Sequence, residues 1–206
     1  MKIVDVLKRI KRSIHRFYVK YVKHLIHNYY VFYADSTELL EKAEEKLRPL
    51  PEGLRFVKLT PENKHLYKCT IDDMDKMLHF SVDGESWLVV DNDNNVVAFH
   101  YGTYRGNRSM FYNVKNCDFE HISIQVDKRY KRKGIALHLL YHIVKNLKYD
   151  DAKNKRLGTC IKPTNIASIE LHELIGFKKS HRVVLIHIRR KKEGRYTFIN
   201  IPRYNI

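Results

Sequence analysis

One short stretch constrains the fold more than any other part of the chain. It reads Val126-Asp-Lys-Arg-Tyr-Lys-Arg-Lys-Gly-Ile-Ala-Leu-His-Leu-Leu140. Residues 121–126 alternate polar and apolar side chains like a half-buried strand, and apolar residues recur at helical spacing from Leu137 to Val144. The sequence therefore predicts a strand, a cationic glycine turn and a helix in immediate succession.

The predicted turn has the chemistry of an anion site. Five of the six residues from Lys128 to Lys133 are Lys or Arg, and Gly134 follows them. A glycine lets a ligand approach the backbone closely. The first turn of a helix presents unpaired N–H groups and the positive end of the helix dipole, and the two together bind phosphate. The turn therefore predicts a phosphate-binding site.

Two blocks of the sequence resemble a known family. The turn Lys131-Arg-Lys-Gly-Ile-Ala136 resembles the acetyl-CoA signature of the GCN5-related N-acetyltransferases. That signature has Arg or Gln, two further residues, Gly, any residue, and then Gly or Ala; here Lys takes the first position. The stretch Asn165-Ile-Ala-Ser-Ile-Glu-Leu-His-Glu-Leu-Ile-Gly-Phe177 resembles the family's second block, in which a helix beginning near Asn ends in Gly-Phe and leads into a strand. With both blocks in the right order, the chain is identified as similar to this family.

The resemblance implies an α/β fold with a mixed central sheet of six to seven strands flanked by helices, over residues 51–206. Residues 1–50 are expected to form an extension with a basic amphipathic helix, an aromatic strand and a short helix, ending at the turn Pro49–Gly53. We expect strands at 28–34, 54–59, 85–91, 95–102, 110–114, 121–126, 156–161, 182–189 and 196–201. A further helix is expected at 38–47, with Ser36 or Thr37 as its cap. Others are expected from Thr60-Pro61, within 67–80, after Gly134 and after Asn165.

Residues 1–27 form a basic amphipathic pattern. Apolar side chains recur every three or four residues, namely Ile3, Leu7, Ile10, Ile14, Phe17, Tyr21 and Leu25. The formal net charge of the whole chain is +16, which favours anionic partners. Three interpretations stay open for this segment: packing on the domain or in a homodimer, peripheral contact with an anionic membrane, and nucleic-acid binding. The order given is the order in which we favour them.

Composition excludes several classes. The three cysteines, Cys69, Cys117 and Cys160, are widely separated and form no CxxC pair, so a disulfide framework or a metal site is not expected. No apolar run reaches the roughly 20 residues that span a bilayer, and no secretory signal is evident. We expect a cytoplasmic protein, with the inner face of the membrane as the alternative location.

The resemblance also implies which residues bind acetyl-CoA. Backbone groups near Ile124 and Val126 are expected to pair with the pantetheine arm like an added strand. The pyrophosphate is expected to face the amides of Arg132, Lys133, Gly134, Ile135, Ala136 and Leu137. Lys131, with Lys128 and Arg129, is expected to neutralise the phosphates. Asn165 is expected to bond the cofactor arm, with a helix N-cap as its structural alternative, and Ser168 is a further cofactor candidate.

Two residues are catalytic candidates. His172 stands four residues before Gly176, where many family members have Tyr, and is expected to be the general acid for the departing thiolate. The alternative for His172 is a packing role in its helix. Glu120, at the start of the signature strand, is the candidate general base; its neighbour His121, with His100 and Glu173, remains an alternative.

The expected function is transfer of an acetyl group from acetyl-CoA to a primary amine by direct attack on the thioester, with no metal. The acceptor is expected to be a small amine, an amino sugar or a protein amine, because the family acts on all of these. The alternative function is a non-catalytic binding module for RNA or a protein partner. No recognised nucleic-acid motif is present, so no specific nucleic acid is expected.

Overall fold

The structure, a computed structural model, describes residues 10–16, 26–69, 84–105, 117–147, 155–189 and 196–203. Residues 10–16 are helical. The remaining elements are β1 (Ile26–Asp35), α2 (Ser36–Lys46), β2 (Arg55–Lys58), the short 3₁₀ helix η2 (Lys64–Leu66), β3 (Gly84–Val90), β4 (Val96–Tyr104), β5 (Phe119–Val126), η3 (Lys128–Tyr130), α4 (Ile135–Asn146), β6 (Arg156–Ile161), α5 (Ile166–Leu174), β7 (Lys178–Arg189) and β8 (Tyr196–Arg203).

The chain forms two compact units. One contains residues 31–180, and the other contains residues 1–30 together with 181–206. The strands are hydrogen-bonded in the order β2-β3-β4-β5-β6-β1-β7-β8. In the smaller unit, β7 and β8 pair antiparallel, and the Arg182 side chain donates a 2.6 Å hydrogen bond to Asn28 Oδ1.

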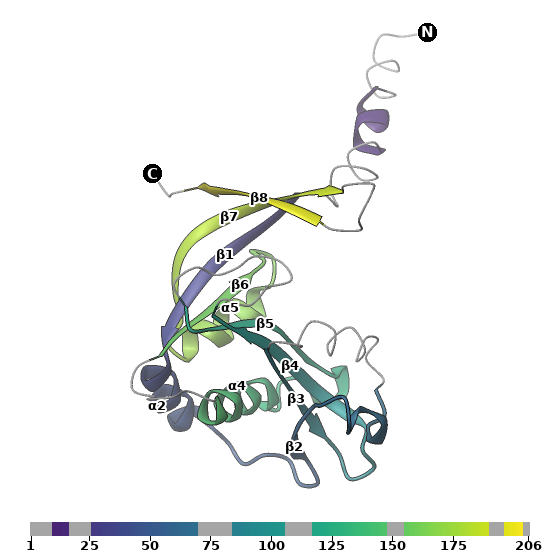
Figure 1. Cartoon of the computed structure of the whole chain (residues 1–206), viewed down its shortest axis with the longest axis vertical. Coiled ribbons are helices and arrows are strands. Elements are labelled where there is room, and N and C mark those ends of the chain that lie inside the picture. The colour runs from purple at the N-terminus through teal and green to yellow at the C-terminus, as the bar shows by residue number, and fades with distance from the viewer. Residues whose placement is uncertain are drawn as a thin grey trace. The chain divides into compact units, whose positions relative to one another are not determined.

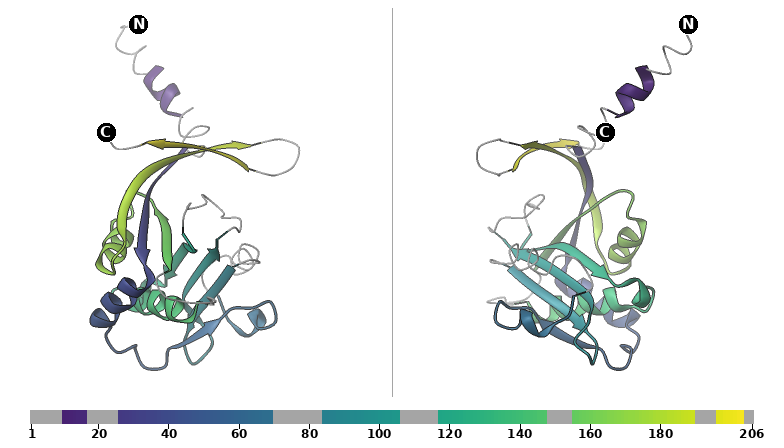
Figure 2. Two further views of the ribbon diagram at one scale, coloured as in Figure 1. Left: turned by 60° about the vertical axis from the view of Figure 1, so that its left-hand side comes forward. Right: turned by 90° about the vertical axis from the view of Figure 1, so that its right-hand side faces the viewer.

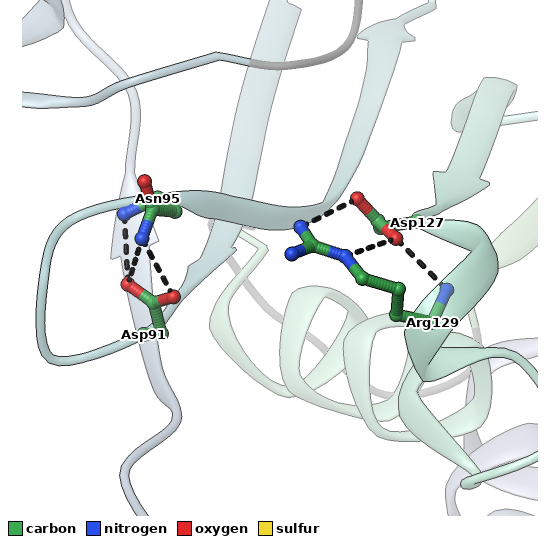
Figure 3. A network of polar contacts seen from close by, with 4 residues as sticks. All are labelled: Asp91, Asn95, Asp127 and Arg129. Carbon is green, nitrogen blue, oxygen red and sulfur yellow. Dashed lines mark hydrogen bonds and ion pairs between the residues drawn. The ribbon is translucent and has the colours of Figure 1, made fainter.

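The larger unit is built on an antiparallel run of strands followed by one parallel pair. β2, β3, β4 and β5 pair antiparallel in succession, and β6 pairs parallel to β5 (Figure 1). The β3–β4 connection is fixed by Asp91, whose carboxylate accepts hydrogen bonds from the backbone and side-chain amides of Asn95 at 2.8–3.1 Å (Figure 3). Asn94 takes a left-handed conformation in this turn, a role that Asn tolerates well.

Helices α2 and α4 pack side by side, as Figure 1 and both views of Figure 2 show. α4 also contacts β3, β4 and β5. The apolar side of α4 is buried through Leu139, Leu140, Ile143 and Val144. α5 connects β6 to β7 in the chain. Burial of these apolar side chains contributes on the order of 1.5–3 kcal/mol each, which holds α4 against β3, β4 and β5.

One close approach fixes β4 against β5. A Cβ added at Gly102 would lie 2.4 Å from the Phe119 ring and 2.6 Å from the Glu120 carbonyl oxygen. Phe119 is fully buried and contacts the rings of His100, Tyr104 and His121. The absence of a side chain at Gly102 therefore lets Phe119 lie flat against the sheet, and this ring anchors the part of β5 that precedes the site.

The α/β architecture expected from the sequence is confirmed. In the part of the chain that the structure describes, the sheet has eight strands, because β1, placed in the expected extension, lies between β6 and β7. The expected division at residue 50 stays a prediction.

Two local expectations were wrong. Thr60-Pro61 opens turns and the short η2 rather than an α-helix. Asp35, not Ser36 or Thr37, caps α2, because its carboxylate accepts from the backbone of Thr37 at 2.9 Å and Glu38 at 3.2 Å. The helix expected in 67–80 lies largely, and the strand at 110–114 entirely, outside the described residues.

Candidate acetyl-transfer site

The parallel strands β5 and β6 pair over only part of their length. The register joins Phe119 to Leu157, Glu120 to Gly158, and His121 to Thr159. The Thr159 hydroxyl donates a 2.9 Å hydrogen bond to the His121 carbonyl oxygen at the last of these pairs. β5 continues to Val126 and β6 to Ile161, so within the described residues the two strands run on past their ladder.

A bulge in β5 begins where this ladder ends. Tyr101 of β4 is opposite Ser123, but the next residue, Gly102, is opposite His121. Ile122 is therefore an extra residue in β5. A bulge leaves such a residue out of the ladder and re-aims its backbone groups and its neighbours' side chains.

The register also sets where the β5 backbone points beyond the bulge. The Asp127 amide donates to the Val97 carbonyl at 2.8 Å, which makes these two residues a hydrogen-bonded pair. Hydrogen-bonded and non-hydrogen-bonded pairs alternate along an antiparallel ladder. Ile124, opposite His100, and Val126, opposite Ala98, are then of the second kind. Their N–H and C=O groups point away from β4, toward the side on which β6 has stopped pairing.

The turn after β5 contains one arginine that is already paired. Asp127 caps η3 by accepting from the Arg129 amide at 2.9 Å, and it also accepts from the Arg129 guanidinium at 3.1 and 3.0 Å (Figure 3). Hydrogen bonding to Asp127 raises the pKa of Arg129. The guanidinium of Arg129 is therefore engaged in stabilising the turn, and it would have to leave Asp127 to bind a ligand.

The last part of the turn exposes backbone. Arg132 and Gly134 have φ angles of 63° and 77°, and Gly134 is the N-cap of α4. A glycine N-cap brings no side chain to the first-turn amides of Ile135, Ala136 and Leu137, which have no partner within the helix. A Cβ added at Gly134 would meet nothing within 4 Å, so open space lies in front of it.

Side chains around Gly134 divide by type. Lys131, Arg132 and Lys133 are exposed, whereas the side chains of Ile135 and Leu137 are buried in the core at 1% and 8% exposure. Ile135 and Leu137 can therefore meet a ligand only through their backbone. The result is a helix N-terminus with open amides, ringed by cations, which is a favourable place for a phosphate group.

His172 lies on α5 in a buried, neutral state. Its Nδ1 donates to the Ser168 carbonyl oxygen at 2.7 Å, and the ring is only 2% exposed. Burial lowers the pKa of His172 to about 4, although the bond to Ser168 acts in the other direction. With the proton held on Nδ1, Nε2 carries a lone pair at neutral pH and is a proton acceptor.

Helix α5 is held by its two ends. The Asn165 side chain accepts from the Ser168 amide at 3.4 Å, so Asn165 is an N-cap. At the other end Gly176, with φ of 97°, lets the chain turn so that the Phe177 amide donates to the His172 carbonyl at 2.9 Å. Phe177 is then buried with its ring 5.0 Å from that of His172.

His100 and His121 form a second buried group beside Phe177. Nε2 of His100 lies 2.8 Å from Nδ1 of His121, and the His121 ring lies 5.9 Å from that of Phe177. Burial, then the charge that His172 would carry, lowers the pKa of His100 to about 3. Burial, then the charges on His100 and His172, lowers the pKa of His121 well below its ordinary value. His100 Nδ1 and His121 Nε2 are buried and have no hydrogen-bond partner among the described residues.

Glu120 lies on the other side of the sheet from His121, since successive strand residues face opposite ways. It is 6% exposed. After the larger effect of burial, its negative charge raises the pKa of both Cys117 and Cys160. The sequence candidates thus fall into two sets: His172 with His121 and His100 around Phe177, and Glu120 with the two cysteines.

A family model described as acetyltransferase (GNAT) family matches residues 60–177, which is more than half of the 206 residues. The chain belongs to the acetyltransferase (GNAT) family. No curated protein matches the chain by sequence.

Several solved structures are similar to this chain at low sequence identity. A tandem GNAT protein from the clavulanic acid biosynthesis pathway has a TM-score of 0.51 and 9% identity, covering 76% of this chain and 51% of that one. A Drosophila protein has a TM-score of 0.46 and 15% identity, covering 84% and 55%. An aminoglycoside antibiotic 6'-N-acetyltransferase from Acinetobacter baumannii has a TM-score of 0.45 and 17% identity, covering 68% and 99%. This chain thus spans about half the length of the first two.

Among the described residues of this GNAT protein, no group of three or more His, Cys, Asp or Glu side chains is arranged to hold a metal ion. None of the helices described is both long and apolar enough to cross a membrane.

The His100–His121 contact was not predicted from the sequence as a pair. Both residues had appeared only as separate candidate bases. The strands expected at 95–102 and 121–126 were separated in the prediction by a strand at 110–114. The register that puts His100 opposite Ile124 and brings its ring to His121 also depends on the Ile122 bulge.

Proposed function

We propose that this GNAT protein transfers an acetyl group from acetyl-CoA to a primary amine by direct attack on the thioester. The observation that carries this proposal is the open N-terminus of α4 at Gly134, directly after the part of β5 that extends past its ladder with β6. A pyrophosphate bound at the N-terminus of α4 would place the pantetheine arm of the cofactor alongside the part of β5 that extends past its ladder with β6. The backbone groups of Ile124 and Val126, which point to that side, are suited to pair with it.

We assign the phosphate contacts mainly to backbone. The amides of residues 132–137 would face the pyrophosphate, with Lys131, Arg132 and Lys133 as exposed cations around it. Arg129 is a weaker candidate because Asp127 holds its guanidinium at 3.0–3.1 Å. Asn165 and Ser168 stay candidates for the cofactor arm; Asn165 is exposed and already acts as a helix cap.

The reaction needs a neutral amine, a stabilised oxyanion and a protonated leaving thiolate. A neutral His172 supports a two-step role. Its Nε2 would first take a proton from the nitrogen that has bonded to the acetyl carbon. The resulting imidazolium would then give that proton to the departing sulfur, as the C–S bond breaks. His172 would thus act as the acid only after it has acted as a base.

Glu120 is proposed as the group that deprotonates the acceptor amine before attack, through water. It is 6% exposed and lies on β5 directly before His121, the residue at which the ladder with β6 ends. Backbone amides at the bulge are suited to stabilise an oxyanion, because Ile122 lies outside the regular ladder.

The proposed function is tested with the purified full chain. We expect acetyl-CoA to raise the melting temperature, and addition of an amine mixture to release a free thiol. The mixture contains polyamines, amino sugars, aminoglycosides and lysine peptides. Free thiol is measured colorimetrically, and mass spectrometry identifies the acetylated acceptor. Stabilisation by RNA but not by acetyl-CoA would instead favour a non-catalytic binding module and overturn the proposal.

The two catalytic assignments predict different kinetic losses. His172→Gln is expected to lower kcat about 100-fold with little change in the KM for acetyl-CoA, since proton transfer typically contributes at least that much.

Glu120→Gln is expected to lower the rate most below neutral pH, where the amine is most protonated. Glu170→Gln is the matched control, because Glu170 is an exposed carboxyl on α5. It should leave both kcat and the pH dependence of the rate unchanged. An unaltered pH–rate profile in Glu120→Gln would remove Glu120 from the mechanism.

A further inference from the structure

The helical segment 10–16 is amphipathic and uncovered. All seven of its residues are exposed, including Ile10 at 50% and Ile14 at 64%. Residues four apart lie on the same face of a helix. At about 100° per residue, Lys11, Arg12 and Arg16 centre on the opposite face. The segment therefore presents two exposed isoleucines on one side and three cations on the other.

The sequence extends both halves of this pattern over residues 1–27. Apolar side chains continue the spacing of the two isoleucines at Ile3, Leu7, Phe17, Tyr21 and Leu25. The cations are Lys2, Lys8, Arg9, Lys11, Arg12, Arg16, Lys20 and Lys23. These eight positive charges less the one negative charge of Asp5 give +7, and no Asp or Glu occurs between Asp5 and Asp35. We call residues 1–27 the N-terminal basic segment.

We propose that the N-terminal basic segment docks the protein on the surface of a lipid bilayer that contains anionic lipids. Ile10 and Ile14 enter the boundary between head groups and acyl chains, and Lys11, Arg12 and Arg16 stay at the level of the lipid phosphates. Such a segment gains free energy from apolar burial and from about 1 kcal/mol of attraction per Lys or Arg near an anionic surface. This proposal does not depend on acetyl transfer.

Two other occupants fit the observations less well. An RNA would satisfy the cations but leave Ile10 and Ile14, both at least half exposed, in water. A second copy of the chain would cover the isoleucines but bring two segments of charge +7 together, with Asp5 as the one acidic residue in each. An anionic bilayer satisfies the apolar face and the charge at the same time.

The test uses the full chain and extruded vesicles of phosphatidylcholine alone or with one part in three of phosphatidylglycerol. We expect co-sedimentation with the anionic vesicles only. The variant Ile10→Ser/Ile14→Ser is expected to bind them about tenfold more weakly or worse, because it loses the apolar insertion. The variant Lys11→Gln/Arg12→Gln/Arg16→Gln is expected to bind about 100-fold more weakly.

Matched variants elsewhere separate docking from general surface effects. Leu66→Ser/Leu174→Ser removes two exposed apolar side chains, of 52% and 49% exposure, from other elements. Lys46→Gln/Lys64→Gln/Lys145→Gln removes three exposed cations. Both variants should co-sediment with the anionic vesicles to the same extent as the unaltered chain, and their melting temperatures should equal that of the unaltered chain.

Any of five results would overturn the proposal. The first two are that the unaltered chain fails to bind anionic vesicles, or that it binds neutral and anionic vesicles equally. The third is that the double serine variant binds as tightly as the unaltered chain, which would mean that charge alone attracts lipid. The fourth is that RNA retains the chain through the same cations while vesicles do not. The fifth is that size-exclusion chromatography shows a dimer, which the double serine variant converts to a monomer, with no vesicle binding by either.

Discussion

Replacement of Gly134 by Glu is expected to raise the KM for acetyl-CoA about 50-fold while kcat falls by less than tenfold. Gly134 caps α4 with φ of 77°, and the space in front of its Cα is open to at least 4 Å. A glutamate side chain would fill that space and set a carboxylate against the pyrophosphate. If the lost phosphate contacts weaken the binding free energy of acetyl-CoA by about 2 kcal/mol, the affinity falls by roughly that factor. Initial-rate kinetics and calorimetric titration with coenzyme A both measure it.

The control for this variant is Gly53→Glu. Gly53 has φ of 79°, so the same substitution costs similar backbone strain and adds the same charge in the turn before β2, where a Cβ would lie 3.0 Å from the Asn92 side chain. It should lower the melting temperature comparably and leave the KM unchanged. Gly134→Ala should give an intermediate effect, because it adds strain without a carboxylate. Equal affinity of the glutamate variant and the unaltered chain for coenzyme A would refute the phosphate site at this turn.

The sequence predicted the elements whose signals are local. β6 was expected at 156–161 and is found there, and the β3–β4 hairpin was expected around Asn92–Asn94. The α4 start at Gly134 followed from a glycine between a cationic turn and a helical apolar pattern. In each case a few neighbouring residues fix the backbone, so periodicity and turn chemistry suffice.

Features that depend on distant residues were not predicted. The place where β5 and β6 stop pairing, at His121 and Thr159, depends on register between strands separated by the whole of α4. The Ile122 bulge is one residue of mismatch between β4 and β5, which no periodicity reveals. Likewise, Asn28–Ala34 read as a strand of an extension, yet β1 lies between β6 and β7 because its partners come from residues more than a hundred positions later.

The protonation state of His172 is a second example. From the sequence, His172 was expected to donate a proton, because the ordinary pKa of histidine lies near neutral pH. Burial at 2% exposure and the Nδ1 bond to the Ser168 carbonyl make it a neutral acceptor instead. Sequence spacing places Ser168 one helical turn before His172, so the bond was accessible to reasoning, whereas the depth of burial under Phe177 was not.

The buried histidines predict that stability falls steeply between pH 6.5 and pH 4. The folded pKa values of His100 and His172 are lowered to about 3 and about 4, so below pH 6.5 the unfolded chain binds more protons than the folded chain. Their stabilising effect is complete above pH 6.5 and is lost as pH falls toward the folded values. For His172 alone, the loss between pH 7 and pH 4.5 is about 2 kcal/mol in free energy of unfolding. Urea titrations at half-unit pH intervals measure it.

The variant His172→Gln isolates this effect. Glutamine does not titrate, so the variant is expected to lose about 2 kcal/mol less than the unaltered chain between pH 7 and pH 4.5, whatever its stability at pH 7. His65→Gln, which replaces an exposed histidine in the same way, is the matched control. The window ends at pH 4.5 so that most carboxyl groups remain ionised. If His172→Gln and the unaltered chain lost stability in parallel, His172 would have to titrate normally in the folded protein, and the proton-acceptor role proposed for its Nε2 would lose its physical basis.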